Sequence, residues 1–418
     1  MIFNRLYYIN KLIGHKHNKM VKVVTGIRRS GKSFLLFELF YKHLIDSGIA
    51  EDHIITIALD DRLNKSLRNP DTCLAHILGL IKDKEMYYVM IDEVQLMDEF
   101  VDVLNSLLHI PNVDTYVTGS NSKFLSSDVM TEFRGRGDEI HVNPLSMSEI
   151  CEAMPDADWN HLWELYMTYG GLPMTIQFQT EKEKADYLKK LLSETYLKDI
   201  KERHNIVNDL ELEQLLSIVA SGIGSLTNPQ KLSNAFLSSG KTKLSAQTIK
   251  QYLDYFCEAF LINKSERFDI KGKRYISTPY KFYFTDLGLR NAKLNFRQIE
   301  ETHLMENAIY NELVLRDFNV DVGVVEIRER DEKNNSVRRQ IEVDFVVNQG
   351  SKRYYIQSAF ALSSIEKAQQ ETRPLINIPD SFKKIIIVKD DILLRRDQYG
   401  IVTMGLKQFL MDWNSLDL

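Results

Sequence analysis

Between residues 21 and 145, short apolar runs alternate with longer amphipathic stretches, which is typical of a parallel sheet wrapped by helices. The short runs predict five strands, at residues 21–26, 53–59, 87–92, 114–120 and 138–145. The longer stretches carry apolar residues at three- and four-residue spacing and have Gly or Pro near their ends. They predict helices at residues 32–48, 70–83 and 99–110. This part of the chain is therefore expected to be an α/β unit.

The remaining chain shows three further patterns. From Pro144 to about residue 220 the pattern is helical, and between Asn228 and Asp286 two shorter helical patterns precede a hairpin. The last third begins with a helix at 303–317 and continues with four strands. These strands are expected at 324–330, 341–347, 353–360 and 383–388. We therefore expect four regions, at 1–145, 146–225, 226–298 and 299–418.

Composition places the 418-residue chain among globular proteins, with 44% hydrophobic and 27% charged residues. It has no apolar run long enough for a membrane helix and no secretory signal, so we expect no membrane association and a cytoplasmic location. Cys73, Cys151 and Cys257 are widely spaced and are expected to be packing residues. Because no metal-binding motif accompanies them, His15 and His17 are expected on a surface loop.

A glycine-rich sequence follows the first predicted strand. Gly26, Gly31, Lys32 and Ser33 fit the pattern GxxxxGK[ST], and a helix is expected directly afterwards. In that context the backbone N–H groups face phosphate oxygens, while the lysine reaches the β- and γ-phosphates and the serine binds Mg²⁺. The residues expected to contact the nucleotide are Gly26, Ile27, Arg28, Arg29, Ser30, Gly31, Lys32, Ser33 and Phe34.

The third predicted strand ends in two carboxylates, Asp92 and Glu93. Beside a P-loop this is the Walker B pattern, in which Asp92 would hold Mg²⁺ and Glu93 would activate the attacking water. Taken alone, the pair could equally be an acidic helix N-terminus. The glycine-rich loop favours the catalytic interpretation, and we expect the loop and the acid pair at the ends of two neighbouring strands.

Two further sets of polar residues are candidates for catalysis. Ser120 and Asn121 end the fourth strand, where the γ-phosphate is expected, and are candidate sensors of the nucleotide. Arg134 and Arg136 follow, and one of them could stabilise phosphoryl charge in a neighbouring subunit of a homo-oligomer. The alternative for these arginines is a solvated basic turn.

Several motifs together resemble those of a known family. GIRRSGKS, MIDEVQ, VTGSNSKFLSS, the RGR turn followed by NPLSMSEI, YGGLP, TYLKDI and KFYFTDLGLRN are similar to those of prokaryotic AAA-type ATPases with a C-terminal restriction-nuclease-like domain. The resemblance covers almost the whole chain. It implies an AAA+ core with ATP and Mg²⁺ as its ligands, a helical and winged-helix region, and a nuclease-fold tail. It implies little about the substrate.

Residues 228–297 form a basic segment in an otherwise acidic chain. They hold 13 Lys or Arg against 5 Asp or Glu, a net charge of +8 within a chain of net charge −5. Its second helix has most of its apolar residues on one face, namely Thr248, Ile249, Leu253, Phe256, Phe260 and Leu261. The hairpin that follows carries Lys271, Lys273, Arg274 and Lys281, which could lie along a DNA backbone. A winged helix that contacts only protein is the open alternative.

In the last region the resemblance implies a nuclease-type site at Glu306, Asp344, Gln357 and Ala359. Gln357 stands where the resemblance puts Glu, and Ala359 stands where it puts Lys. A site of this kind needs a cation to stabilise the attacking hydroxide or the developing phosphorane charge. We therefore expect a fold that has lost cleavage activity.

The sequence leaves three hypotheses for function. The first is an ATPase whose nucleotide state changes its conformation or assembly, with DNA as a possible partner. The second is an ATP-dependent nuclease acting through Asp344. The third is a protein-interaction module that binds nucleotide without hydrolysing it, and Glu93 favours the first over this one.

Overall fold

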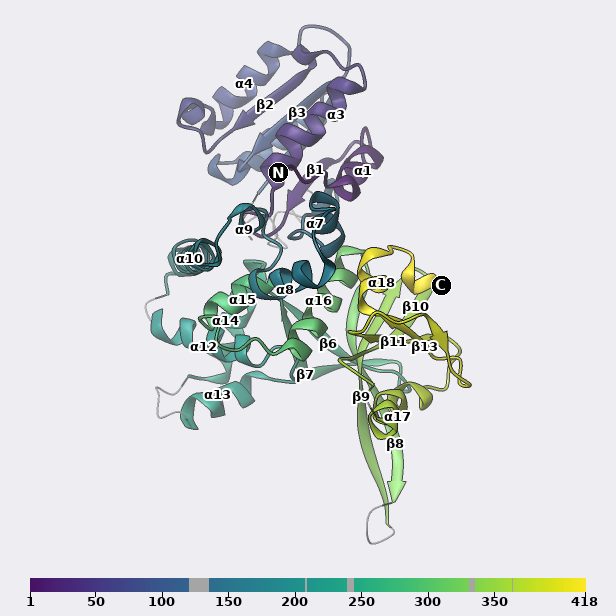
Figure 1. Cartoon of the computed structure of the whole chain (residues 1–418). Helices are drawn as coiled ribbons and strands as arrows, with labels where there is room; N and C mark the ends of the chain where they lie inside the picture. Colours follow the sequence, from purple (N-terminus) through teal and green to yellow (C-terminus); the bar gives the residue numbers. More distant parts are fainter. Residues whose placement is uncertain (120–134, 207–208, 239–243, 331–334, 363) are drawn as a thin grey trace. The chain divides into compact units, whose positions relative to one another are not determined.

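The structure is a computed structural model that describes residues 1–119, 135–206, 209–238, 244–330, 335–362 and 364–418. Contacts within the chain divide it into two compact units (Figure 1). Unit 1 comprises Met1–Leu145 with Leu172–Gln177 and Glu258–Phe260, and unit 2 comprises the rest. Each unit contains one sheet.

Unit 1 is built on a five-stranded parallel sheet in the order β2-β3-β4-β1-β5. Its strands are β1 Val21–Thr25, β2 Ile54–Ala58, β3 Tyr87–Asp92, β4 Val113–Thr118 and β5 Gly137–His141. Its helices are α1 Leu6–Gly14, α2 Lys32–Phe34, α3 Tyr41–Asp46, α4 Pro70–Leu80, α5 Phe100–Leu108 and α9 Pro173–Gln177, with short helical segments at Leu35–Phe40, Glu51–His53, Arg62–Arg68 and Val94–Leu96. The predicted α/β class is confirmed, including all five strands.

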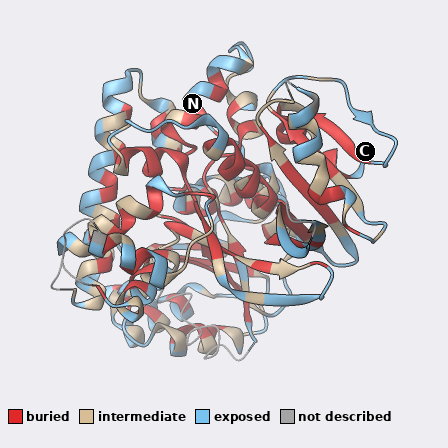
Figure 2. Ribbon diagram, turned by 90° about the horizontal axis from the view of Figure 1, so that it is seen from below, coloured by how far each residue is buried: buried red, intermediate tan, exposed pale blue. Residues whose placement is uncertain are grey.

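Successive side chains along each strand point to opposite faces of this sheet, and helices cover both faces. Val89 and Ile91 share a buried cluster with residues of α4 and α5, whereas Tyr88 and Met90 point to the other face. On that face the ring of Tyr116 contacts both Tyr88 and a phenylalanine that precedes α3. Every residue of β1 and β3 is buried, and Figure 2 colours the described residues of the chain by burial.

The order of the strands corrects one expectation. The glycine-rich loop after β1 and the acid pair after β3 were expected on neighbouring strands, but β4 lies between β1 and β3. Both loops still leave the same edge of the sheet, because all five strands are parallel. The end of β4 therefore lies between the two loops.

Unit 2 contains helices followed by an eight-stranded mixed sheet in the order β12-β13-β11-β10-β9-β8-β6-β7. Its strands are β6 Ile262–Asp269, β7 Arg274–Phe284, β8 Asn319–Arg330, β9 Ser336–Gln349, β10 Lys352–Ala359, β11 Lys383–Val388, β12 Arg395–Arg396 and β13 Val402–Gly405. Its helices are α7 Met147–Ala153, α8 Trp159–Tyr169, α10 Glu181–Leu191, α11 Lys198–His204, α12 Asp209–Ser221, α13 Pro229–Ser238, α14 Ala246–Glu258, α15 Leu287–Lys293, α16 Glu301–Leu315, α17 Ile365–Ile376 and α18 Leu406–Met411, with short helical segments at Leu192–Leu197 and Ser415–Asp417.

The hairpin of the basic segment belongs to this same sheet. Strand β6 pairs with β7 on one side and runs parallel to β8 on the other, with Phe268 opposite Gly323. The ladder thus joins residues on either side of the boundary expected at 298/299. The division into four domains remains a proposal.

Two motifs that carry the family resemblance pack against each other within unit 2. The Gly171 N–H donates to Asp286 Oδ2 at 2.8 Å, and Asn291 Nδ2 donates to the carbonyl of Met167 at 2.8 Å. A Cβ added at Gly288 would lie 2.1 Å from the carbonyl oxygen of Tyr169. YGGLP and TDLGLRN therefore fix α15 against the end of α8.

No helix among the described residues has the length and apolar character needed to cross a bilayer.

Candidate functional site

The glycine-rich loop begins where β1 meets its edge neighbour. Gly26 has φ 132°, and a Cβ there would lie 2.2 Å from the carbonyl oxygen of Val142, so only glycine fits this turn. Gly31 also has a positive φ of 95° and directly precedes α2. The loop therefore presents its backbone and the following helix to the space beyond the carboxyl end of β1.

Lys32 is almost completely buried and carries no direct ion pair among the described residues. Its Nζ donates to the carbonyl oxygens of Gly26 at 3.0 Å and Ile27 at 3.1 Å. Burial lowers the pKa of Lys32 to about 8, although the charges of Glu93 and Asp92 oppose this shift. The ammonium is thus close enough to the acid pair to interact with it electrostatically. Its positive charge is nevertheless poorly balanced by these carboxylates.

Asp92 lies at the buried end of β3 and accepts hydrogen bonds from the hydroxyls of Thr118 and Ser33. Burial raises the pKa of this carboxyl, and the two hydrogen bonds oppose the shift. The Ser33 and Asp92 side chains, 59 positions apart in sequence, are therefore in direct contact. Hydroxyl and carboxylate oxygens are ligands that suit Mg²⁺.

Glu93 follows in a left-handed backbone conformation with φ 51°. Its N–H donates to Thr118 Oγ1 at 3.1 Å, and its carboxylate accepts a short hydrogen bond from Gln95 Nε2. A non-glycine residue at positive φ is strained and needs support from its surroundings. The bond to Thr118 supplies that support at the end of β3.

Thr118 was not among the residues that the sequence pattern predicted for this site. Its hydroxyl donates to Asp92 and accepts from the Glu93 N–H, so it links both members of the acid pair. The sequence placed the polar end of this strand at Ser120 and Asn121, which lie outside the described residues, as does Arg134. Thr118 lies two residues before this predicted polar end, within the strand predicted at 114–120, and its hydroxyl was the available signal.

Arg136 does not join this cluster within its own chain. It is exposed, and its carbonyl accepts from the Val21 N–H at the amino end of β1. The P-loop follows the carboxyl end of the same five-residue strand, so the two backbones are about 15 Å apart at about 3.3 Å per residue. A role for Arg136 in a neighbouring subunit stays a prediction.

The residues at this edge of the sheet fit a nucleotide phosphate and a divalent cation. Ser30 Oγ is buried with no hydrogen-bond partner among the described residues, in the turn that precedes Lys32. Ser33 is exposed beside the Asp92 carboxylate. A buried ammonium, an unsatisfied hydroxyl and adjacent hard oxygen ligands match the chemistry of a phosphate with bound Mg²⁺.

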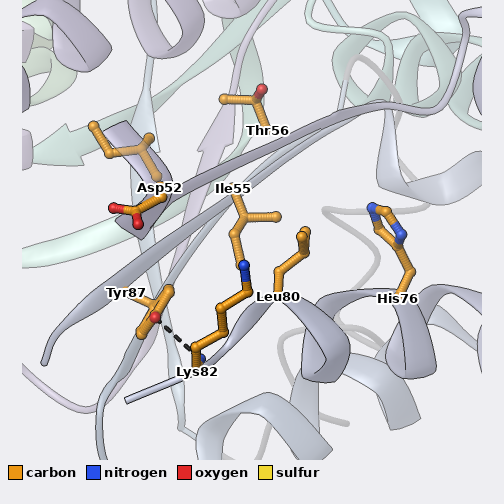
Figure 3. Close-up of a pocket in the computed structure, with 8 residues that line it drawn as sticks. Asp52, Ile55, Thr56, His76, Leu80, Lys82 and Tyr87 are labelled. Atoms are coloured by element: carbon orange, nitrogen blue, oxygen red, sulfur yellow. Dashed lines mark hydrogen bonds between the residues drawn. The ribbon is translucent and has the colours of Figure 1, made fainter. Parts of the chain in front are cut away.

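A cavity of about 210 Å³ in unit 1 lies at the opposite edge of the sheet (Figure 3). It is lined by Asp52, Ile54, Ile55, Thr56, His76, Leu80, Lys82 and Tyr87. Tyr87 begins β3, and its hydroxyl accepts a hydrogen bond from the Lys82 N–H at 3.1 Å. Because the acid pair lies at the other end of β3, this cavity is separate from the P-loop cluster.

In unit 2, Glu306, Asp344 and Gln357, three residues expected at the nuclease-type site, lie close together. Asp344 Oδ2 accepts from the Ser358 N–H at 2.8 Å, and Gln357 Oε1 accepts from the Asp344 N–H at 3.4 Å. Glu306 on α16 is also buried and is electrostatically coupled to Asp344. In the described part of the chain, no group of three or more His, Cys, Asp or Glu is arranged to hold a metal ion.

The cation in this second cluster is Lys281, and this corrects its expected role. Its Nζ lies 2.8 Å from Glu306 Oε1, 2.7 Å from Glu342 Oε1 and 3.8 Å from Asp344 Oδ1. Burial would lower the pKa of Lys281, but the three carboxylates raise it above its ordinary value. Lys281 was expected on a DNA-facing hairpin, and it is instead buried and ion-paired.

The chain is similar to several known proteins. Residues 18–151 match the AAA domain family, and residues 160–300 match a domain of unknown function. An uncharacterized protein of Haemophilus influenzae is 31% identical over 395 residues, which cover 92% of this chain and 93% of that protein. An uncharacterized protein of Methanocaldococcus jannaschii is 29% identical, with 86% of this chain and 78% of that protein covered.

Solved structures with similar features include the Orc1 protein of Aeropyrum pernix in complex with DNA and AMPPCP-bound DnaA from Aquifex aeolicus. Orc1 is 10% identical and DnaA 14%, and both superpositions have a TM-score of 0.31. They cover 71% and 61% of this chain, and 93% and 88% of the respective solved chains.

The parallel sheet, the glycine-rich loop and the matched AAA domain together define an AAA-type P-loop protein. Within that class, the chain belongs to the same family as the Haemophilus influenzae protein, because it is more than 30% identical to that protein over almost the full length of both.

Proposed function

We propose that the chain binds ATP with Mg²⁺ and hydrolyses it, and that the nucleotide state changes the conformation or assembly of the protein. One observation carries this proposal. The Lys32 ammonium, the Ser33 hydroxyl and the Asp92 and Glu93 carboxylates lie at one edge of the sheet, with Thr118 between the two loops. These are the groups that phosphoryl transfer to water requires.

The reaction assigns a separate task to each residue. Ser33 and Asp92 would hold Mg²⁺, which when bound offsets the negative charge of the phosphate oxygens. Lys32 would bind the β- and γ-phosphates, and the P-loop N–H groups would orient them. Glu93 would accept a proton as the water oxygen bonds to the γ-phosphorus and the bond to the β,γ-bridging oxygen breaks, which leaves ADP and phosphate.

Lys32→Ala and Glu93→Gln test this assignment by phosphate release and by binding of a fluorescent ATP analogue. Glu93→Gln is expected to bind nucleotide but to lower kcat by about 10²–10⁴-fold, because it removes the base. Lys32→Ala is expected to lose binding as well. Lys42→Ala and Glu99→Gln, at exposed positions of the same unit, are the matched controls.

Turnover at the wild-type rate in both site variants would refute the site. A wild-type chain that binds ATP and releases no phosphate would instead support the third hypothesis, a nucleotide-binding module without hydrolysis. The ATP affinity of Lys32→Ala separates these outcomes, because only an incorrectly assigned site leaves it unchanged.

DNA contact is a further part of the proposal, and it rests on fewer residues than the sequence suggested. Lys273 and Arg274 are exposed on the β6–β7 hairpin, whereas Lys281 is buried. We expect duplex DNA affinity to fall steeply with salt and to weaken when Lys273 and Arg274 are both replaced by Ala. DNA binding that is absent or independent of salt would favour the alternative, in which the expected winged-helix region contacts only protein.

Assembly is the last part of the proposal. A homo-oligomer would let Arg136, or Arg134, reach the site of a neighbouring subunit. Mass measurement with ATP, and the turnover of an equal mixture of Arg136→Ala and Glu93→Gln chains, test this together. Activity recovered in the mixture would show that the arginine acts between subunits.

The ion-paired cluster bears on the nuclease hypothesis, because a nuclease-type site needs a cation. Ala359, which stands where the resemblance puts Lys, cannot supply one. Lys281 does place an ammonium beside Glu306 and Asp344. That ammonium is already matched by three carboxylates, which favours a structural role. Incubation of supercoiled plasmid with ATP and Mg²⁺ or Mn²⁺ decides. Nicking that Asp344→Ala abolishes would overturn the structural interpretation.

A further inference from the structure

We propose that Gln95 is a second water-positioning residue of the ATPase reaction, which orients the attacking water that Glu93 deprotonates. The inference rests on the proposed function and adds a residue to its site. Gln95 lies in the short helical turn Val94–Leu96, directly after the acid pair that ends β3. This turn keeps it next to Glu93 in space as well as in sequence.

The orientation of the Gln95 amide is set by its partner. Nε2 donates a short hydrogen bond to Glu93 Oε2. A carboxylate has only acceptor atoms, so the amide nitrogen and not the amide oxygen must face it. The position of Gln95 Oε1 on the other side of the amide follows from this chemistry.

Gln95 Oε1 is buried and accepts no hydrogen bond from any residue that the structure describes. A buried acceptor without a donor costs free energy, so such atoms call for a specific explanation, of which a bound water or a catalytic role is one. The acceptor belongs to an amide whose nitrogen holds the expected catalytic base. A water that donates to Glu93 would therefore find a second acceptor close by.

The chemistry of hydrolysis needs such a second acceptor. The attacking water carries two O–H bonds, and only one proton is transferred to Glu93 as the new O–P bond forms and the bond to the leaving ADP breaks. The remaining O–H must point away from phosphorus so that an oxygen lone pair can face it. Gln95 Oε1 accepts this O–H and, being a neutral amide oxygen, orients the water without taking its proton.

The Glu93 N–H is already bonded to Thr118, so the attacking water would be oriented by side chains. The positive φ of Glu93 turns the chain at the end of β3, and the bond from its N–H to Thr118 fixes that turn. The Glu93 carboxylate is then held by the Gln95 amide. Gln95 thus contacts both the base and the reacting water, in the way a positioned glutamine serves other phosphoryl-transfer enzymes.

Gln95→Ala and Gln95→Glu test the inference in the full-length chain with ATP and Mg²⁺. Gln95→Ala is expected to lower kcat by about 10–100-fold while changing ATP affinity by less than about threefold, because the water is misplaced and the phosphate contacts remain. Gln95→Glu keeps an acceptor but places a second carboxylate beside Glu93. Its pH profile of kcat is therefore expected to shift to higher pH on the acidic side, which a merely structural role would not cause.

Leu96→Ala is the matched control, because Leu96 is the neighbouring residue in the same turn and is 41% exposed. It is expected to retain wild-type kcat. Gln95→Asn keeps an amide on a shorter side chain and controls for misfolding of the alanine variant. Its kcat is expected to lie between that of the wild type and that of Gln95→Ala.

The outcomes separate this inference from the proposed function. If Glu93→Gln abolishes turnover but Gln95→Ala stays within about twofold of wild type, Gln95 has no such role and the ATPase site stands. A faster Gln95→Ala would also overturn the inference, because it would mean that Gln95 restrains Glu93. If the wild-type chain releases no phosphate, the proposed function fails, and this inference fails with it.

Discussion

The two units each bury a lysine next to carboxylates, yet the two lysines differ in what surrounds them. Lys32 donates to two carbonyl oxygens of its own loop, and burial lowers its pKa to about 8. Lys281 is held by three carboxylates, which raise its pKa. The positive charge of Lys32 is therefore poorly balanced by its surroundings, whereas the charge of Lys281 is balanced by nearby carboxylates.

The difference separates a group prepared for a ligand from a group used for structure. A poorly compensated buried cation gains free energy when a phosphate arrives, so it favours binding. A cation already matched by carboxylates gains little from a new anion and holds its neighbouring elements together instead. Burial alone therefore does not identify a functional lysine, whereas the nature of its partners does.

Exchanging each lysine for methionine should give the largest contrast. Lys281→Met is expected to lower the local free energy of unfolding around β7, α16 and β9 by about 3–5 kcal/mol, because it leaves buried carboxylates without a counter-charge. Lys32→Met is expected to leave the stability of unit 1 unchanged or slightly increased, because it removes a desolvated ammonium. Native-state hydrogen exchange without nucleotide measures both.

Lys273→Met, at an exposed position of the β6–β7 hairpin, controls for the loss of any lysine. Equal destabilisation by Lys32→Met and Lys281→Met would remove the distinction between the two sites.

The pH dependence of ATP affinity sharpens the same comparison. The phosphates need the protonated Lys32, whose pKa in the free chain is about 8, so affinity is retained below that pH and lost as the pH rises above it. Titration calorimetry should show roughly tenfold weaker binding at pH 9 than at pH 7. Lys32→Arg should bind with much less dependence on pH over this range, because arginine stays charged. A wild-type affinity that is constant up to pH 9 would contradict the assigned environment of Lys32.

Thr118→Val should have a smaller effect than the loss of protonation at Lys32. It removes the hydroxyl that joins Asp92 to the Glu93 N–H but keeps the shape of the side chain. We expect kcat to fall by roughly fivefold, the value of about one hydrogen bond, and Thr118→Ser to restore most of it. A valine variant with unchanged steady-state phosphate release would mean that the backbone at Glu93 needs no such support.

Much of the fold could be predicted from the sequence, because local patterns determine local structure. All five strands of unit 1 lie where apolar runs predicted them, and the helical pattern from Pro144 to about residue 220 holds among the described residues. Lys32, Ser33, Asp92 and Glu93 lie at one edge of the sheet, because a motif fixes each loop and parallel strands bring the loops to that edge. Their chemical roles remain to be tested.

What the sequence did not reveal depends on pairing between distant segments. The order of the sheet put β4 between β1 and β3 and so brought Thr118 to the acid pair. Likewise, Lys281 looked like a surface cation of a basic hairpin until β7 carried it to Glu306 and Glu342. Neither contact follows from the spacing of residues along the chain.

The parallel ladder between β6 and β8 affects how the protein can be divided. Neither the part of the chain before residue 298 nor the part after it contains the complete sheet. Separate expression of the two parts would leave rows of backbone N–H and C=O groups unpaired along a strand edge, which is a template for aggregation. The two fragments would need to be produced together in the same cell so that each could complete the other.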